Sequence, residues 1–207
     1  MAVGKRFLDV AMAVLIGGLL VLPVLGMVVW LARGQGRPLL YGAERMKTPS
    51  QGFTLWKFRT MRAAADDAGV SGGDKAWRIT PQGAIMRRYR LDEIPQLWNV
   101  LRGDISFVGP RPPLREYTRA FPELYSEVLR SKPGITGLAS LVYAEHEEKL
   151  LARAKTPTET DAIYRRLCVP TKARLDLIYQ KHASICFDLR LIWQTARRFV
   201  PNWLGKR

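Results

Sequence analysis

The chain has 207 residues, enough for one buried core and too few for two comfortable domains. It carries 33 Lys and Arg against 18 Asp and Glu, a formal net charge of +15, so its expected partner is anionic: nucleic acid, an anionic membrane surface or a phosphorylated substrate. The two cysteines, Cys168 and Cys186, form no CxxC pair and are interpreted as buried free thiols in a reducing compartment. The two histidines lack the spacing of zinc ligands, which argues against a zinc site.

The first predicted element is a membrane segment. Residues Val10–Ala32 carry no charge and are apolar on every side, unlike an amphipathic helix of a soluble protein. As one straight helix the run would reach about 34 Å, enough for a hydrocarbon core of about 30 Å. Pro23 divides it into Val10–Leu22 and Val24–Ala32, which would reach about 20 Å and about 14 Å, so neither half spans alone.

The charges that flank this run distinguish a crossing helix from a re-entrant one. Transmembrane helices tolerate a proline as a kink, so Pro23 by itself does not decide. A crossing helix usually has its excess of positive charge on one side, whereas here Lys5 and Arg6 precede the run and Arg33 follows it. We therefore predict a helix that bends at Leu22-Pro23 and returns to the face that it entered.

The rest of the chain predicts an α/β fold that is mainly helical with a small β element. Alternation over Phe53–Met61 predicts a strand, and a short strand is expected to lead into a rigid turn over residues 105–113. Helices are predicted over Ala63–Gly69, Pro81–Arg90, Asp92–Leu101, Leu114–Ser131, Thr158–Leu167 and Lys172–Val200, and a loop over Lys132–Leu138. Pro95 fits its helix only in the first turn, which places the acid pair of residues 92 and 93 at a helix amino terminus.

The last predicted helix is amphipathic. One face carries an apolar stripe, which we interpret as facing the core: Leu189, Ile192, Trp193, Ala196 and Val200. The segment from Phe199 to Arg207 mixes aromatic and basic residues, a composition that suits a membrane interface. Interfacial amphipathic helices are therefore expected beside the membrane segment.

The candidate site is an acid pair that follows a cluster of arginines. Asp92 and Glu93 come directly after Arg87, Arg88 and Arg90, and Arg111 is held between two prolines. One interpretation is ordinary surface salt bridges, which contribute little. Against it, adjacent side chains on a helix diverge, and a helix amino terminus already favours negative charge. The cations are therefore in surplus and predict a phosphate-binding site, with Arg111 oriented by its prolines at low entropic cost.

Such a carboxylate could attack phosphorus. Among so many cations we expect Asp92 to have a lowered pKa and to stay ionised. An ionised aspartate can form an acyl phosphate and so divide one difficult transfer into two easier steps. The arginines, with Mg²⁺, would hold a diphosphate, and carboxylate oxygens are suitable ligands for that metal.

Three motifs carry a family resemblance: LDEIPQLWNVLRGDISFVGPRP from Leu91, KFRTM at Lys57–Met61 and KPGITGL at Lys132–Leu138. Together they resemble the bacterial sugar transferases, the monotopic polyprenol-phosphate phosphoglycosyl transferases that begin glycoconjugate assembly. The resemblance runs from the KRFLDV segment at Lys5 to the DLRLIW segment at Asp188, and the chain length matches the small members that consist of the catalytic core alone.

The resemblance implies transfer of a sugar 1-phosphate from a UDP-sugar to undecaprenyl phosphate, with release of UMP, by a ping-pong route. It implies that Asp92 is the nucleophile, that Glu93 is its catalytic partner, and that both carboxylates bind the required Mg²⁺. It implies that Arg87 and Arg111 lie near the nucleotide phosphates and that Lys57 lies near the active site. We predict that Arg59 and Arg88 also belong to the phosphate-binding group. Residues 1–36 would form the re-entrant helix and residues 37–207 a catalytic domain on the cytoplasmic face of the bacterial inner membrane, in contact with anionic lipids. The family often has Ser-Pro at the bend, where this chain has Leu22-Pro23.

The sequence also bears on two other classes of function. A membrane-anchored nucleic-acid-binding protein would need cations interleaved with stacking aromatics or a helix-turn-helix pattern, and neither is found in the sequence. A non-catalytic scaffold would not need an acid pair inside an arginine cluster. The sequence leaves open which UDP-sugar is used, which we expect loops such as Ser71–Trp77 and Tyr143–Leu151 to decide, and whether the protein is a homodimer.

Overall fold

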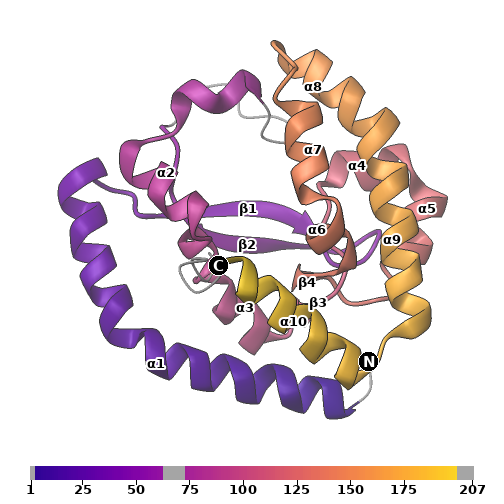
Figure 1. Ribbon diagram of the computed structural model, residues 1–207, viewed down its shortest axis with the longest axis horizontal. Coiled ribbons are helices and arrows are strands. Elements are labelled where there is room, and N and C mark those ends of the chain that lie inside the picture. The colour runs from indigo at the N-terminus through magenta and orange to yellow at the C-terminus, as the bar shows by residue number, and fades with distance from the viewer. Residues whose placement is uncertain (1–2, 63–72, 200–207) are drawn as a thin grey trace, which may run out of the picture.

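A long helix wraps around a body of shorter helices and two small sheets (Figure 1). The computed structural model describes residues 3–62 and 73–199. In chain order the first five elements of the described residues are α1 Val3–Gln35, β1 Leu40–Met46, β2 Gly52–Phe58, η1 Gly73–Arg78 and α2 Pro81–Arg88. They are followed by η2 Leu91–Glu93, α3 Gln96–Arg102, β3 Ser106–Val108, α4 Arg115–Ala120, α5 Pro122–Val128, β4 Gly134–Thr136, α6 Leu138–Val142, α7 Ala144–Leu151, α8 Pro157–Ile163, η3 Tyr164–Cys168, α9 Val169–His182 and α10 Ile185–Phe199. The prediction of a mainly helical fold with a small β element is confirmed.

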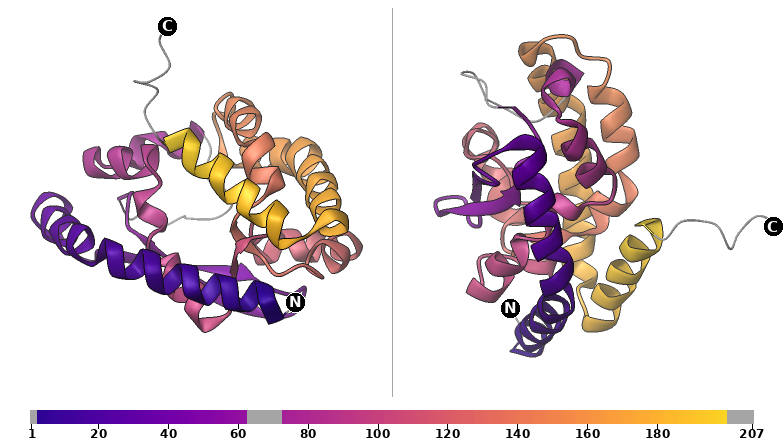
Figure 2. Two further views of the ribbon diagram at one scale, coloured as in Figure 1. Left: turned by 60° about the horizontal axis from the view of Figure 1, so that its bottom comes forward. Right: turned by 90° about the vertical axis from the view of Figure 1, so that its left-hand side faces the viewer.

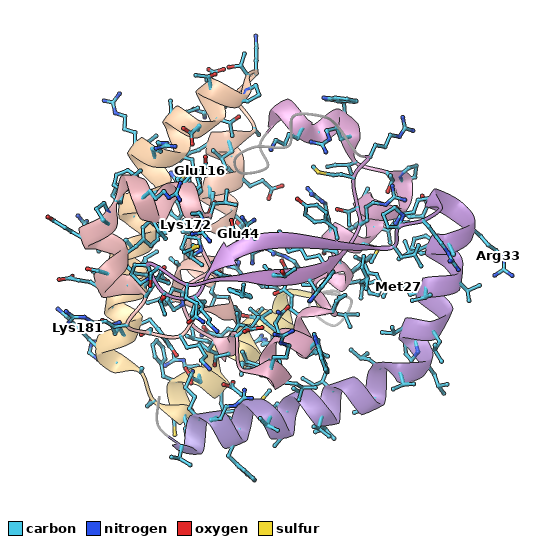
Figure 3. The ribbon with its side chains drawn as sticks, turned by 180° about the vertical axis from the view of Figure 1, so that it is seen from behind. Met27, Arg33, Glu44, Glu116, Lys172 and Lys181 are labelled. Atoms are coloured by element: carbon cyan, nitrogen blue, oxygen red, sulfur yellow. The ribbon has the colours of Figure 1, made fainter. Side chains whose placement is uncertain are left out.

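The membrane segment is one continuous helix that changes direction. α1 contains Pro23 without interruption, and Figure 1 shows it turning near its middle. Met27 and Arg33 both lie on the limb beyond the turn (Figure 3). Proline removes one backbone hydrogen bond and crowds the preceding turn, which accounts for a bend in a helix that is otherwise intact. Only 6% of its most apolar 18-residue window is buried, far less than in the core helix of a soluble protein.

The amino-terminal end of α1 is fastened to the body by charged residues. Lys5 Nζ donates to Val108 O at 3.0 Å and forms an ion pair with the carboxylate of Asp188 on α10. Arg6 donates to the backbone oxygens of Val100 and Leu101, at 2.6 and 2.8 Å, where α3 ends. Figure 2 shows the start of α10 against the start of α1.

The carboxyl-terminal end of α1 is fastened to the same body. Arg59 Nη2 donates to the carbonyls of Gln35 and Gly36, at 2.7 and 2.8 Å, which offsets the unpaired carbonyls of a helix end. The Gln35 side chain in turn donates to Arg59 O at 2.7 Å and accepts from Thr80 at 2.9 Å. Both ends of the apolar helix are therefore held by one body, and its middle is left uncovered.

Two sheets of two strands position the site. β1 and β2 pair antiparallel with Leu40 opposite Phe58 and Met46 opposite Gly52, so the predicted strand is confirmed and its partner was missed. β3 and β4 pair in parallel, which places a strand inside the predicted loop Lys132–Leu138. The two backbones approach closely because glycine lines them: a Cβ at Gly109 would lie 2.1 Å from Lys132 O.

Several helix boundaries differ from the prediction. The helix expected over Leu114–Ser131 is divided at Phe121, because Pro122 begins a new helix at α5. The gap expected before Lys172 is helical, because the π-helix η3 ends at Cys168 and α9 begins at Val169. A break at residues 183–184 separates α9 from α10. The short helix predicted at Ala63–Gly69 lies outside the described residues.

Most of the predicted apolar stripe of α10 faces outward. Leu189 and Trp193 are 44% and 65% exposed, so the core-facing interpretation is wrong for them, whereas Ile192 is half-buried against the core and Val200 lies outside the described residues. Leu191, outside the stripe, is buried. Leu191 and buried Asp188 anchor the helix by its other face. Cys168 is buried as predicted, but Cys186 lies exposed at the start of α10, so the prediction for this thiol is also wrong. The outward apolar face agrees with the expectation of an interfacial amphipathic helix.

Candidate active site

The acid pair lies in a tight turn between two helices. Arg90 has a φ of 55°, and this left-handed residue redirects the chain into the 3₁₀ turn η2. α3 begins only at Gln96, with Pro95 as its cap, so the pair precedes that helix instead of forming its first turn. Asp92 and Glu93 are both 7% exposed, and a buried carboxylate must find partners or change its pKa.

Glu93 forms ion pairs with three cations. Its Oε1 accepts from Arg111 Nη2 at 2.7 Å, from Lys57 Nζ at 3.0 Å and from Arg90 Nη1 at 3.2 Å. Burial alone would raise the pKa of Glu93, but the charges of Arg111, Lys57 and Arg90 outweigh burial and hold that pKa far below its ordinary value. In return the Glu93 carboxylate raises the pKa of Arg111. Glu93 is therefore a permanent anion that fixes three cations in place.

Asp92 has the opposite environment. Its Oδ1 is buried and has no hydrogen-bond partner among the described residues. Burial raises the pKa of Asp92 and the Glu93 charge adds to the rise, while Lys57, Arg87 and Arg90 lower it without cancelling the effect. The expectation of a lowered pKa for Asp92 is wrong, because the cations contact the neighbouring carboxylate. The structure thus places one unpaired, more basic carboxylate beside a neutralised one.

The predicted phosphate-binding cations divide into two groups. Lys57 and Arg111 contact Glu93. Arg87 donates to Thr60 Oγ1 at 3.0 Å. Burial lowers the pKa of Arg87, although the nearby charge of Asp92 acts to raise it. Arg88 is exposed and lies 5.7 Å from the ring centroid of Tyr89, and Arg59 is occupied by carbonyls at the end of α1. The structure therefore assembles the first three around the acid pair and leaves the last two outside.

Backbone contacts from distant segments place these side chains. Asn99 on α3 joins the acid turn to β2, since its Oδ1 accepts from Trp56 N at 3.1 Å and its Nδ2 donates to Thr54 O at 2.8 Å. Lys57 is the next residue on that strand and so points at Glu93. Arg111 follows β3, in a turn stiffened by prolines on either side.

A cavity of about 240 Å³ opens beside the pair. Glu93, Arg90 and Arg111 form its polar end, and Ile16 and Leu20 of α1 belong to its apolar wall. A larger hollow of about 380 Å³ between α5 and α9 shares no lining residue with it. The site is therefore open toward the uncovered membrane helix.

The acid pair also suits a divalent cation. No group of three or more potential metal-binding His, Cys, Asp or Glu residues occurs in the described parts of the chain. Mg²⁺, however, is commonly bound by one or two carboxylates together with substrate phosphates and water. The orphaned, buried Oδ1 of Asp92 provides such an oxygen, so the residues present fit the metal.

Comparison with known proteins gives one consistent answer. A family model described as "Bacterial sugar transferase" matches residues 1–202. The chain is 36% identical over 167 residues to the uncharacterized sugar transferase EpsL of Bacillus subtilis, covering 81% of this chain and 72% of the relative. It is 31% identical over 205 residues to the UDP-glucose:undecaprenyl-phosphate glucose-1-phosphate transferase of Caulobacter vibrioides, covering 97% and 69%. It is also 29% identical to the UDP-N-acetylgalactosamine-undecaprenyl-phosphate N-acetylgalactosaminephosphotransferase of Aeromonas hydrophila, covering 96% of this chain but only 44% of that protein.

Proposed function

Since the chain belongs to the bacterial sugar transferase family, we propose that it moves a sugar 1-phosphate from a UDP-sugar to undecaprenyl phosphate and releases UMP. The names of the Caulobacter and Aeromonas relatives support this class of donor and acceptor. The observation that carries the proposal is the divided acid pair: an unpaired buried Asp92 beside a Glu93 that holds three cations. Such a product would be the first membrane-bound intermediate of a polysaccharide or another glycoconjugate.

The proposed reaction has two displacements at one phosphorus. In the first, a carboxylate oxygen of Asp92 attacks the phosphorus that bears the sugar, and the bond from this phosphorus to UMP breaks with its electron pair leaving on UMP. In the second, a phosphate oxygen of undecaprenyl phosphate attacks the same phosphorus, and the bond to Asp92 breaks, which regenerates the carboxylate. The raised pKa of Asp92 favours this role, because a more basic carboxylate is a better nucleophile when it is ionised.

The surrounding residues would hold charge rather than move protons. Arg111, Lys57 and Arg87 present fixed cations to the anionic oxygens of a diphosphate, and Glu93 keeps the first two in position. Asp92 and Glu93 would hold Mg²⁺ against the substrate phosphates, where the ion would supply charge neutralisation for the transferring group.

The membrane helix suits the lipid acceptor. The cavity next to Glu93 and Arg111 is bounded by Ile16 and Leu20 of α1, so a polyprenyl chain could lie against the helix while its phosphate reaches the acid pair. Because both ends of α1 are held by one body, we propose that the helix enters and leaves the same leaflet. We propose that this body lies on the cytoplasmic face, because nucleotide sugars are cytosolic.

The proposal is tested with Asp92→Asn, which keeps the shape of the side chain and removes the attacking charge. Membranes containing the parent should release UMP from at least one UDP-sugar in a panel when undecaprenyl phosphate is added, and donor labelled in the sugar should leave a covalent adduct on the protein. We expect Asp92→Asn to lose nearly all turnover and the adduct. Glu123→Gln removes an exposed carboxylate on α5 and should leave both intact. More than a few per cent of parental turnover in Asp92→Asn would contradict the assignment.

A further inference from the structure

One half-buried cation near Arg111 has a buried nitrogen with no partner among the described residues. Arg45 lies on β1, and its buried Nη1 makes no hydrogen bond within the described residues. Its neighbour Glu44 is on the opposite face of the strand, is exposed, and forms an ion pair with Arg115 at 2.5 Å. Arg45 therefore points inward, while the nearest acid in the sequence points out to solvent.

The backbone ties Arg45 to the turn that carries Arg111. Met46 N donates to Pro113 O at 2.9 Å, which joins the end of β1 to the Pro-Arg-Pro turn. Burial lowers the pKa of Arg45, and the positive charge of Arg111 lowers it further, as expected of two cations that share one space. Arg111 is neutralised by Glu93, and Arg45 is not.

A third cation and an aromatic ring complete this group. Lys172 on α9 forms an ion pair with Glu147 at 2.9 Å, and its Nζ lies 5.1 Å from the ring centroid of Tyr164. The Tyr164 charge acts to raise the pKa of Arg45, and the Arg111 charge acts to lower that of Lys172, so the four side chains lie within reach of one another's charges.

This group is separate from the lining of the cavity beside α1. Arg111 and Glu93 line the cavity beside α1, whereas Arg45, Lys172 and Tyr164 do not. The site thus has one side next to the membrane helix, where Ile16 and Leu20 of α1 adjoin charged residues, and another side where Arg45 has a buried nitrogen without a partner among the described residues. A lipid phosphate fits the side next to α1, and a water-soluble anion fits the side next to Arg45.

A buried, unpaired cation is costly to maintain in the free protein. The guanidinium fork matches two oxygens of one phosphate, so an anionic ligand would remove that cost on binding. Building on the proposed function, we propose that Arg45 binds the α-phosphate of the UDP-sugar, the phosphate that leaves as part of UMP. In the first displacement, the bond between the sugar-bearing phosphorus and the bridging oxygen of the diphosphate breaks. The electron pair stays on that oxygen, which leaves as part of the α-phosphate of UMP. Arg45 offsets the new negative charge and keeps its own protons.

Ping-pong kinetics isolate this role, because kcat/KM for each substrate reports only its own half-reaction. Arg45→Lys keeps the charge and loses the fork, and Arg45→Met loses both. We expect Arg45→Lys to lower kcat/KM for the UDP-sugar about tenfold, or about 1.4 kcal/mol, and Arg45→Met to lower it further, with kcat/KM for undecaprenyl phosphate within about twofold of the parent. Arg115→Met, which breaks only the exposed pair with Glu44, should change neither value.

Binding of UMP gives a second readout that does not need turnover. UMP should raise the melting temperature of the purified full-length protein, and this rise should shrink in Arg45→Lys and vanish in Arg45→Met. Without UMP, Arg45→Met should melt no lower than the parent, because the variant removes an unpaired buried charge. If Arg45→Met melts at a lower temperature than the parent without UMP, the inference is tested with Arg45→Lys alone, by its kinetics and by the rise in its melting temperature on adding UMP.

Three results would overturn the inference: equal losses for both substrates, a loss confined to undecaprenyl phosphate, or an unchanged effect of UMP on the melting temperature. A loss confined to the lipid would assign Arg45 to the acceptor phosphate instead. If the parent itself releases no UMP, the proposed function fails, while the binding measurement still decides whether Arg45 holds a nucleotide phosphate.

Discussion

The two adjacent carboxylates should differ strongly in their effect on stability when each is converted to its amide. Glu93→Gln leaves Lys57, Arg90 and Arg111 without their common anion, and breaking a buried ion pair typically costs about 3–5 kcal/mol. Because the Arg90 side chain is 45% exposed and water compensates part of its loss, we expect a decrease of about 3 kcal/mol in the free energy of unfolding. For a chain of this size that corresponds to a melting temperature lower by about 6–12 °C.

Asp92→Asn should change stability by less than about 1 kcal/mol, because Asp92 Oδ1 has no hydrogen-bond partner among the described residues and burial already opposes its charge. The raised pKa of Asp92 means that its ionisation weakens folding above its unfolded-state pKa of about 3.9, so removing the charge at pH 7 sacrifices no stability. The lowered pKa of Glu93 means that its contribution is complete above about pH 4.3 and is lost only as the pH falls toward the much lower folded-state pKa.

The assay is thermal unfolding of the purified protein in one detergent, followed by tryptophan fluorescence at pH 7 and pH 5. The melting temperature of Glu93→Gln should lie well below that of the parent by a similar margin at both pH values. Glu123→Gln, an exposed change of the same chemistry, should melt with the parent. Equal melting temperatures for the Glu93 and Asp92 variants, or a larger loss for Asp92→Asn, would refute the division of roles within the pair.

Two further predictions concern the phosphate clamp and the membrane helix. Arg111→Lys keeps a positive charge but loses the planar fork, so turnover or donor affinity should fall about tenfold, or about 1.4 kcal/mol, and unchanged kinetics would make Arg111 purely structural. Pro23→Ala, with Gly17 and Gly18 changed to Leu, should straighten α1, so that a fraction of the molecules has its amino terminus outside the cell. This fraction is measured with a membrane-impermeant thiol reagent on a cysteine introduced at position 2, in a background without Cys168 and Cys186. Labelling of position 2 in the otherwise unchanged cysteine-free background would mean that the helix simply crosses.

The sequence by itself determined the features that depend on neighbouring residues. The uncharged run with Pro23, the proline-bounded Arg111 and the adjacent acids of residues 92 and 93 are all local patterns: the run forms one helix, Arg111 lies in a turn after β3, and the acid pair lies in a 3₁₀ turn just before α3. Lys57 was also identified correctly as a neighbour of the acid pair. The local features could be predicted because their residues are neighbours in the chain, so the covalent backbone alone brings them together or, at the prolines, fixes their conformation.

Only the tertiary structure decided which charges meet. Asp92 and Glu93 are equivalent as letters, but the β2 strand and the Pro-Arg-Pro turn arrive on the side of Glu93, so that residue takes the cations and Asp92 does not. Arg59 follows Lys57 by two residues, yet β2 ends at Phe58 and Arg59 falls to the end of α1. Arg45 gave no signal in the sequence, because its isolation results from β1 lying against a turn far along the chain. A charge is paired or unpaired according to what lies across space from it, and that is set by how distant segments pack.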